Sequence, residues 1–242
     1  MIWFVGAGPG AVDLITVRGA ELLRKADVIV YAGSLVNPEL VRMYASSSCE
    51  LHDSSGMTIA EIVDVLADGE RRELLTVRLH SGDPALYGAV REQFDALRQR
   101  GIPFEVVPGV SSLFAASAAL KTEYMIPGRV QTLVVSRVEG RTAAGDAVST
   151  ALFLSAGMME KACGELIARG YSPETPAAVV YRASWPDEKV IRGTLETLPE
   201  LAQGITKSAL ILAGEFLRQD LHEASRLYDE HFSHEYRHSG LH

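Results

Sequence analysis

The sequence predicts an α/β protein built from two α/β domains. In the first half, short apolar runs alternate with segments of helical periodicity, a pattern typical of strand–helix units in a mainly parallel sheet. In the second half the apolar runs follow one another more closely, which favours a mixed sheet with antiparallel pairs. We therefore expect an N-terminal domain over residues 1–120, a linker over 121–128, a mixed domain over 129–217 and a polar tail over 218–242.

Apolar runs and helix caps predict the elements of the first half. Thr16 and Thr58 have the position of N-caps, Asn37-Pro38 starts a short helix, and residues 46–57 are polar enough to be a loop. The predicted strands are residues 2–5, 28–31, 74–79 and 104–107, and the other predicted helices are 86–100 and 111–120.

The second half contains five apolar runs and one clear helix. Trp185-Pro-Asp187 lies between two of the runs and predicts a hairpin loop. The strands are expected at residues 130–136, 151–155, 177–183, 189–194 and 208–214, and the helix at about 158–169.

Composition limits the classes of partner. A 242-residue chain with 47% hydrophobic residues can bury a full core, and its net charge of -8 argues against nucleic acid or an anionic membrane as a partner. The two cysteines, Cys49 and Cys163, have no metal-binding spacing and suggest reduced thiols in the cytoplasm. The N-terminus carries no basic leader, and no apolar run reaches the ~18 residues of a membrane span.

The polar tail holds five of the seven histidines. A metal site is one reading of this tail, but a solvated tail is the favoured one. These residues are His222, His231, His234, His238 and His242.

The stretch Gly82-Asp-Pro84 lies between a predicted buried strand and a predicted helix, where ligands bind in open α/β sheets. Gly82 allows the backbone to approach a ligand, and Asp83 offers an acceptor. Similar loops of small residues follow other predicted strands, at residues 6–10, 108–112 and 155–157. Several such loops together predict an organic ligand lying across strand ends.

Two other readings of these residues were weighed. Gly6-x-Gly8-x-x-Ala11 fits a relaxed dinucleotide fingerprint, but Asp13–Thr16 delays the helix and no acidic residue follows the second strand.

His80 is either a proton carrier or a strand-end histidine with a satisfied hydrogen bond, and Asp83 is a better capping residue than a general base. No catalytic residue is assigned.

The motifs, in this order, resemble the tetrapyrrole (corrin/porphyrin) methylases that use S-adenosylmethionine. The resemblance covers about residues 1–217, and it is carried by Val5-Gly-Ala-Gly-Pro-Gly-Ala11, Ser81-Gly-Asp-Pro-Ala-Leu-Tyr-Gly88, Glu105-Val-Val-Pro-Gly-Val-Ser-Ser112 and Ala209-Leu-Ile-Leu-Ala-Gly-Glu215. Within the family, four more segments resemble the branch that methylates carbon C11 of precorrin-4 in cobalamin biosynthesis: Tyr31-Ala-Gly-Ser-Leu-Val36, His52-Asp-Ser-Ser-Gly-Met57, Glu139-Gly-Arg-Thr142 and Ser225-Arg-Leu-Tyr-Asp229.

The resemblance implies a fold, a methyl donor and a set of site residues. It implies two α/β domains with the cofactor in the cleft between them, a homodimer, S-adenosyl-L-homocysteine as a product, and no metal of the protein's own. Carried over by position, the residues implied to line the cofactor site are Pro9, Ser81, Gly82, Asp83, Leu86, Ser111, Ser112, Ser155, Ala209 and Gly214. For the tetrapyrrole substrate they are Tyr31, Ser34 and Arg141.

Two positions depart from the uroporphyrinogen methylases of the family. Those enzymes carry an aspartate after the tyrosine of the second strand and a methionine at the position of Ser155, whereas this chain has Ala32 and Ser155. Both differences point away from uroporphyrinogen as substrate. The open alternatives are a sister methylase acting at another carbon, a same-fold methylase acting on a macromolecule, and a carrier that binds a tetrapyrrole without methylating it. The presence of cobalt in the substrate is also open.

We predict that Arg141→Ala weakens tetrapyrrole binding and leaves S-adenosylmethionine binding intact, because a guanidinium binds carboxylates in bidentate fashion. Arg129, Arg137 and Arg182 lie at other strand ends and are further candidates for the substrate carboxylates, with Arg141 as the first choice. Calorimetric titration with each ligand is the measurement. An unchanged affinity for the tetrapyrrole would remove Arg141 from the substrate residues.

Overall fold

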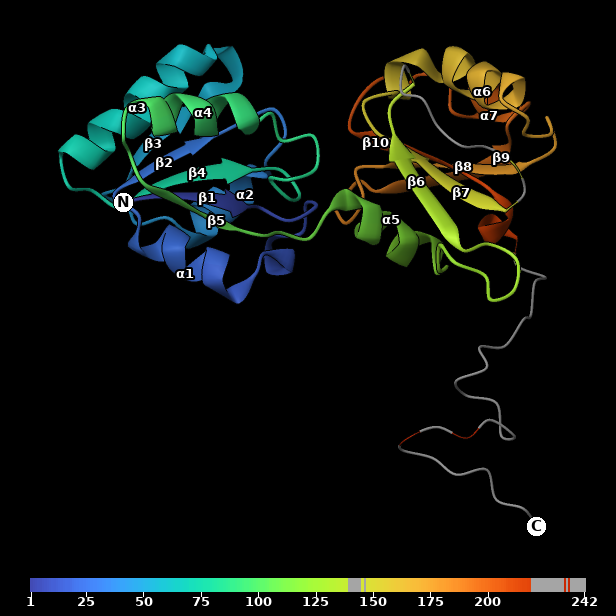
Figure 1. The fold of residues 1–242 in the computed structure, drawn as a ribbon, viewed down its shortest axis with the longest axis horizontal. Coiled ribbons are helices and arrows are strands. Elements are labelled where there is room, and N and C mark those ends of the chain that lie inside the picture. Colours follow the sequence, from blue (N-terminus) through green and yellow to red (C-terminus); the bar gives the residue numbers. More distant parts are fainter. Residues whose placement is uncertain (139–144, 146, 219–232, 234, 236–242) are drawn as a thin grey trace. The chain divides into compact units, whose positions relative to one another are not determined.

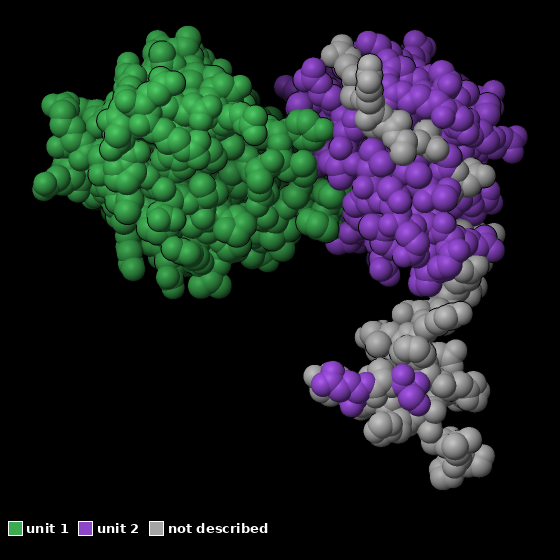
Figure 2. Space-filling view, viewed as in Figure 1, with its two compact units in different colours: residues 1–116, 182–188 green, residues 117–181, 189–242 purple. Residues whose placement is uncertain are grey.

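The computed structural model describes residues 1–138, 145, 147–218, 233 and 235, and these residues form two compact units (Figures 1 and 2). Unit 1 consists of residues 1–116 and 182–188, and unit 2 of residues 117–181 and 189–242. Residues 182–188, the loop between two strands of unit 2, therefore belong to unit 1. No helix of the described residues is long and apolar enough to cross a membrane.

Unit 1 is a five-stranded parallel sheet with helices on both faces, in the strand order β3-β2-β4-β1-β5 (Figure 1). The strands are β1 (Ile2–Gly6), β2 (Val28–Tyr31), β3 (Glu50–Asp53), β4 (Thr76–His80) and β5 (Phe104–Val107). The helices are α1 (Val17–Lys25), α2 (Pro38–Tyr44), α3 (Ile59–Arg71), α4 (Arg91–Gln99) and α5 (Ser112–Leu120), of which α5 continues into unit 2. The expectation of a mainly parallel first half is confirmed.

Helix caps fix where the helices of unit 1 begin. The Thr16 hydroxyl accepts a hydrogen bond from the Gly19 amide, and the Asn37 side chain accepts one from Glu39. Thr58 and Glu61 form a reciprocal capping box at the start of α3. All three expected N-caps are confirmed. The apolar stripes of α1 and α2 cover one face of the sheet, and those of α3 and α4 cover the other.

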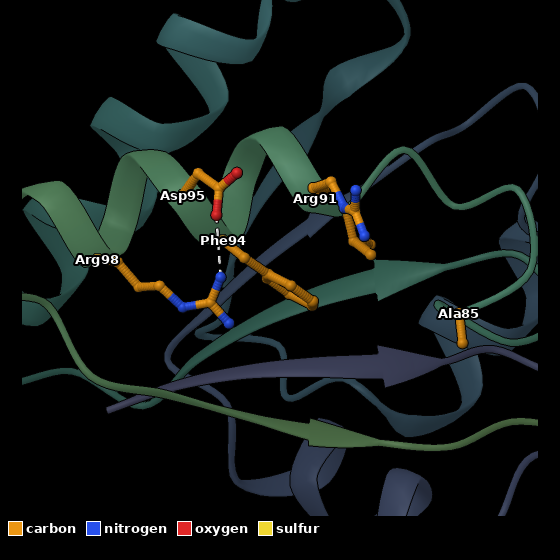
Figure 3. A pocket seen from close by; sticks show the side chains of 6 residues that line it. Ala85, Arg91, Phe94, Asp95 and Arg98 are labelled. Atoms are coloured by element: carbon orange, nitrogen blue, oxygen red, sulfur yellow. Dashed lines mark hydrogen bonds and ion pairs between the residues drawn. The ribbon is translucent and has the colours of Figure 1, made fainter.

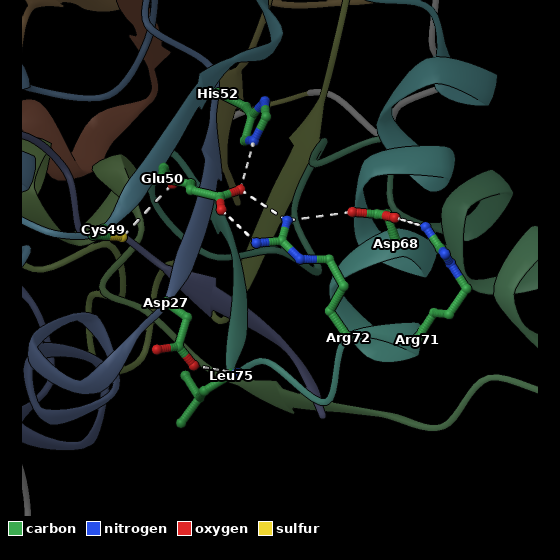
Figure 4. Close-up of polar contacts among 8 residues, drawn as sticks. All are labelled: Asp27, Cys49, Glu50, His52, Asp68, Arg71, Arg72 and Leu75. Carbon is green, nitrogen blue, oxygen red and sulfur yellow. Dashed lines mark hydrogen bonds and ion pairs between the residues drawn. The ribbon is translucent and has the colours of Figure 1, made fainter.

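Strand β3 corrects the expectation of a loop over residues 46–57. Its side chains are mostly exposed, so it lacks an apolar signal, but parallel pairing with β2 places Val28 opposite Glu50 and Tyr31 opposite Asp53. An ion pair adds to this pairing: Arg72 donates to Glu50 at 2.5 Å and to Asp68 at 3.3 Å (Figure 4). The hydrogen bond from Arg72 lowers the pKa of the Glu50 carboxyl.

The segment before α4 also differs from expectation. A helix was predicted over residues 86–100, but α4 begins at Arg91. Tyr87 and Ala89 have φ values of 58° and 48°, left-handed conformations that cannot continue an α-helix. The side-chain amide of Gln93 donates to the Ala89 carbonyl at 3.0 Å and stabilises this turn.

Unit 2 is a mixed five-stranded sheet in the order β6-β7-β10-β8-β9, with one parallel pair, β6–β7, and antiparallel pairs elsewhere. The strands are β6 (Thr132–Ser136), β7 (Val148–Leu152), β8 (Pro176–Tyr181), β9 (Lys189–Thr194) and β10 (Ala209–Ala213). Helices α6 (Met159–Ala168) and α7 (Leu198–Leu201) pack on the sheet. The hairpin loop expected at Trp185-Pro-Asp187 is confirmed. Strand β7 ends at Leu152, earlier than expected, because Leu154 has a φ of 54°.

Candidate functional site

Three glycine-containing loops of unit 1 meet because they follow three adjacent strands, β4, β1 and β5. The loop after β1 and the loop after β4 form a short antiparallel bridge, in which the Gly82 amide donates to the Gly8 carbonyl at 2.8 Å. The Ala7 amide donates to the His80 carbonyl at 2.7 Å. The strand pattern therefore brings together the loops that the sequence singled out.

Missing side chains make the contact possible. A Cβ atom on Gly6 would lie 2.5 Å from the Gly109 Cα and 2.6 Å from the Gly82 carbonyl oxygen. A Cβ on Gly109 would overlap the same carbonyl oxygen. Gly82 has a φ of +65°, which disfavours other residue types there. Glycines at these positions thus let the backbones of the three loops come into contact.

Asp83 binds two of these loops with one carboxylate. Its Oδ1 accepts a hydrogen bond from the Ala85 amide, and its Oδ2 accepts one from the Gly109 amide, both at 2.8 Å. Both oxygens are therefore used by the backbone, which agrees with a capping and positioning role better than with that of a general base.

The remaining cofactor residues implied for unit 1 lie in these same loops. Ser111 is buried, and its Cα would be 3.6 Å from a Cβ on Gly82. Ser112 begins α5, and the Leu86 amide donates to the Asp83 carbonyl. Pro9 accepts a hydrogen bond from the Trp185 indole at 3.0 Å. The loops after β1, β4 and β5 thus gather Pro9, Ser81, Gly82, Asp83, Leu86, Ser111 and Ser112.

The loop of residues 182–188 was expected only as a hairpin, and its packing was missed. Besides the Trp185 contact, the Ala11 amide donates to the Ser184 hydroxyl at 3.0 Å. A Cβ on Gly10 would overlap the Trp185 ring. Arg182 contacts the Asp187 carboxylate at 2.6 Å and lies over the Trp185 ring. No local sequence signal predicts a contact between segments more than 170 residues apart.

A second cluster lies at the carboxyl ends of β2 and β3, where Tyr31 and Ser34 were implied as substrate residues. Asp53 Oδ1 accepts hydrogen bonds from the Gly33 amide at 2.9 Å and from the Ser55 hydroxyl at 2.6 Å. The Ser55 hydroxyl in turn accepts one from the Ser34 amide at 3.1 Å. These bonds lower the pKa of the Asp53 carboxyl. The cluster joins the Tyr31–Val36 and His52–Met57 motifs into one unit, which sequence spacing did not reveal.

The three implied residues of unit 2 do not form one group. Ser155 is fully buried, and its hydroxyl donates to the Phe153 carbonyl and accepts from the Val138 amide at 3.0 Å. Ala209 begins β10 opposite Tyr181, while Gly214 follows the other end of the same strand. Ser155 and Ala209 are thus on the side of unit 2 where β7 and β8 end, and Gly214 is on the opposite side. Arg141 lies outside the described residues, as do Glu139-Gly-Arg-Thr142 and all five tail histidines.

His80 is buried where β4 enters the central loop. Burial, together with the charge of Arg78, lowers its pKa to about 3, so the ring is neutral at physiological pH. One side of the ring bonds the Gly88 backbone, whereas Nε2 is buried with no hydrogen-bond partner. His80 therefore matches the strand-end histidine with a satisfied hydrogen bond rather than the proton carrier.

A pocket of about 560 Å³ lies on α4, lined by Ala85, Val90, Arg91, Phe94, Asp95 and Arg98 (Figure 3). Arg98 is bound by Asp95 at 2.9 Å and lies over the rings of Phe94 and Phe104. The pocket contains none of the implied site residues. Among the described residues, no group of three or more His, Cys, Asp or Glu side chains could hold a metal ion.

Comparisons with known proteins show which family the chain belongs to. Residues 1–199 match the model of the family described as Tetrapyrrole (Corrin/Porphyrin) Methylases. A cobalt-precorrin-4 C(11)-methyltransferase of Methanocaldococcus jannaschii is 47% identical, over 97% of this chain and 95% of that relative. A precorrin-4 C(11)-methyltransferase of Pseudomonas aeruginosa is 40% identical, over 98% of each chain.

Two solved structures of methyltransferases are also similar to this chain. The X-ray structure of a cobalt precorrin-4 methyltransferase has a TM-score of 0.83 and 42% identity, covering 90% of this chain and 95% of that one. A uroporphyrin-III C-methyltransferase of Thermus thermophilus complexed with S-adenyl homocysteine has a TM-score of 0.76 and 30% identity, covering 90% and 98%.

We expect Gly109→Ala to separate the loops, because the added methyl group overlaps the Gly82 carbonyl oxygen. The free energy of unfolding should fall by about 1–3 kcal/mol, and S-adenosylhomocysteine should bind at least about tenfold more weakly. Denaturant unfolding and calorimetry measure the two effects. Gly164→Ala is the control: its Cβ meets nothing within 4 Å in α6, so stability should rise by about 0.5–1 kcal/mol with binding unchanged. Tight binding by Gly109→Ala would contradict the proposed close contact.

We expect His80 to make unit 1 sensitive to acid. Its folded pKa is about 3, and an unfolded histidine has a pKa of about 6.5, so below pH 6.5 only the unfolded state takes up the proton. Stability should therefore fall as pH decreases, by about 2 kcal/mol between about pH 7.5 and pH 5.0 for this group. Denaturant unfolding of His80→Gln should show a shallower dependence of stability on pH than the wild-type protein. An equal slope for His80→Gln would refute this assignment.

Proposed function

Since the chain belongs to the tetrapyrrole (corrin/porphyrin) methylases, we propose that it transfers a methyl group from S-adenosylmethionine to carbon C11 of precorrin-4, or of cobalt-precorrin-4, in cobalamin biosynthesis. The observation that carries the proposal is the meeting of three backbone-lined loops in unit 1, joined by the Gly8–Gly82 bridge and by Asp83. The similarity to relatives of that name over nearly their whole length supports the choice of substrate.

The residues present suit a methyl donor with a charged sulfur. S-adenosylmethionine supplies an electrophilic methyl group, so the protein has to align the reactants and exclude water more than to supply a nucleophile. In unit 1 the donor would be held by Pro9, the Ser81–Asp83 loop, Leu86 and Ser111–Ser112. The glycines of these loops bring their main-chain groups close together, and the Asp83 carboxylate holds two of the loops in place. The neutral, buried His80 has no role in proton transfer in this scheme.

The substrate would lie against the cluster formed by the motifs Tyr31–Val36 and His52–Met57. Ser34 and Ser55 supply hydroxyls there, and the Asp53 carboxylate is occupied by hydrogen bonds within the cluster. Arg141 is our candidate for a carboxylate of the macrocycle, from the resemblance alone. Ser155, Ala209 and Gly214 stay proposed cofactor residues of unit 2.

Two further properties are proposed from the resemblance and the composition. We propose that the enzyme is a homodimer, which light scattering of the purified protein tests, and that it works in the cytoplasm on a free tetrapyrrole. The acidic net charge of -8 supports a small-molecule substrate rather than nucleic acid.

We expect the purified protein to transfer one labelled methyl group from S-adenosylmethionine to precorrin-4, with the label at C11. Mass spectrometry counts the methyl groups, and nuclear magnetic resonance of the product locates the label. Metal-free and cobalt-containing substrates offered side by side decide between the two forms. Uroporphyrinogen III is the control and should gain no label.

Two results would overturn the proposal. Tight tetrapyrrole binding without transfer in either form would favour the carrier, and a label at another carbon would favour a sister methylase.

A further inference from the structure

The buried face of β4 that packs towards α3 and α4 is polar, although its neighbours are apolar. Thr76, Arg78 and His80 alternate along the strand and so share one face, and each is at most 5% exposed. The surrounding core consists of Ile2, Phe4, Val28, Val30, Ile62, Val63, Leu66 and Leu97. Burying a guanidinium in such a core is costly unless its hydrogen bonds are satisfied.

The Arg78 guanidinium donates hydrogen bonds to neutral acceptors. Its Nη1 donates to the Val30 carbonyl at 3.2 Å and to the Ser54 hydroxyl at 3.0 Å. Its Nε donates to the Gln93 Oε1 at 3.2 Å. Within the described part of the chain, no carboxylate forms an ion pair with it. Burial lowers its pKa to about 10, so it still carries its charge at neutral pH.

The bonds of Nη1 lead to the end of β2. The Ser54 hydroxyl, which accepts from Arg78, donates to the Tyr31 carbonyl at 3.1 Å. Ser54 follows Asp53, whose carboxylate holds the Gly33 amide. We call this connection, from Arg78 through Ser54 to residues 31–34, the first arm. It ends on the segment that carries Tyr31 and Ser34.

The bond of Nε leads to the loop after β4. Gln93 accepts from Arg78 and donates to the Ala89 carbonyl at 3.0 Å, while His80 bonds the Gly88 backbone. Tyr87 and Ala89 both have left-handed backbone conformations, which persist only where the surroundings impose them. We call this connection, from Arg78 through Gln93 to residues 85–90, the second arm. It ends on the turn that contains Leu86.

We infer that Arg78 is a positioning residue that holds the substrate segment 31–34 and the cofactor turn 85–90 in one fixed arrangement. The inference deepens the proposed function, on which it rests for the assignment of the two segments to tetrapyrrole and methyl donor. A planar guanidinium suits this task because its donors diverge in a fixed fork, whereas a lysine ammonium is a point charge.

Two separate substitutions each remove the hydrogen bonds of one arm. Ser54→Ala removes the first arm and should raise the KM for precorrin-4 about fivefold, with the Kd for S-adenosylhomocysteine within about twofold of the wild type. Gln93→Met, of similar volume, removes the second arm and should raise that Kd about fivefold, with KM nearly unchanged. Arg78→Lys keeps the charge but loses the fork, so both constants should rise and kcat should fall.

Thr76→Val is the matched control. Thr76 lies on the same strand face, two residues away, and its hydroxyl has no hydrogen-bond partner. Its removal should leave both constants unchanged. Deuterium exchange of the free protein should show faster exchange within 31–34 in Ser54→Ala, within 85–90 in Gln93→Met, and in both segments in Arg78→Lys.

The outcomes separate the two proposals. If the wild type transfers no methyl group to precorrin-4 while the exchange pattern and the S-adenosylhomocysteine Kd shift as expected, the proposed function fails and the positioning role stands. If the variants lose thermal stability but keep both constants and the exchange pattern, Arg78 is only structural and the inference is overturned. Wild-type constants in Arg78→Lys would overturn it too.

Discussion

The site of unit 1 depends on one steric constraint: no side chain stands between the backbones of the loops after β4, β1 and β5. Gly6 and Gly109 lie so close to each other and to the Gly82 carbonyl that a single methyl group would separate them. Once the backbones touch, the Gly8–Gly82 bridge and the Asp83 carboxylate fix their amides. The three loops are thus held together by backbone hydrogen bonds and one carboxylate. Such an arrangement suits a reaction whose methyl donor is already reactive and whose rate depends on alignment.

Three buried polar side chains of unit 1 lie on the strand that leads into the central loop. Thr76, Arg78 and His80 all lie on one face of β4, yet only the two nearer to the loops bond segments of the site. Thr76, at the other end of the strand, has a hydroxyl without a partner. Burying Arg78 without a carboxylate costs stability, and its bonds converge on the ends of β2 and β4. The hydrogen bonds of Arg78 and His80 thus lie at the end of β4 where the loop begins, and they act on segments of the proposed site.

Local chemistry explains which features could be predicted from the sequence. Apolar runs, N-cap residues and glycine turns act within a few residues, so four strands of unit 1, the helix starts at Thr16, Asn37 and Thr58, and the meeting of the strand-end loops can be predicted. The features that the sequence did not predict depend on strand pairing and side-chain contacts rather than on a local pattern. β3 is held by pairing and by Arg72 rather than by an apolar face. The turn before α4 depends on Gln93, and residues 182–188 fold onto Pro9 from the far end of the chain.

The two motifs that point to a C11 methylase are a single structural feature. Parallel pairing of β2 with β3 places Tyr31 opposite Asp53, and the Asp53 carboxylate accepts a hydrogen bond from the Gly33 amide. A methyl group on Gly33 would overlap that carboxylate, so glycine and aspartate require each other. The carboxylate makes its bonds within the cluster, and Ala32 adds no further negative charge where uroporphyrinogen methylases carry an aspartate. The hydrogen bonds of Asp53 and Ser55 therefore tie the Tyr31–Val36 segment to the His52–Met57 segment at this edge of the sheet.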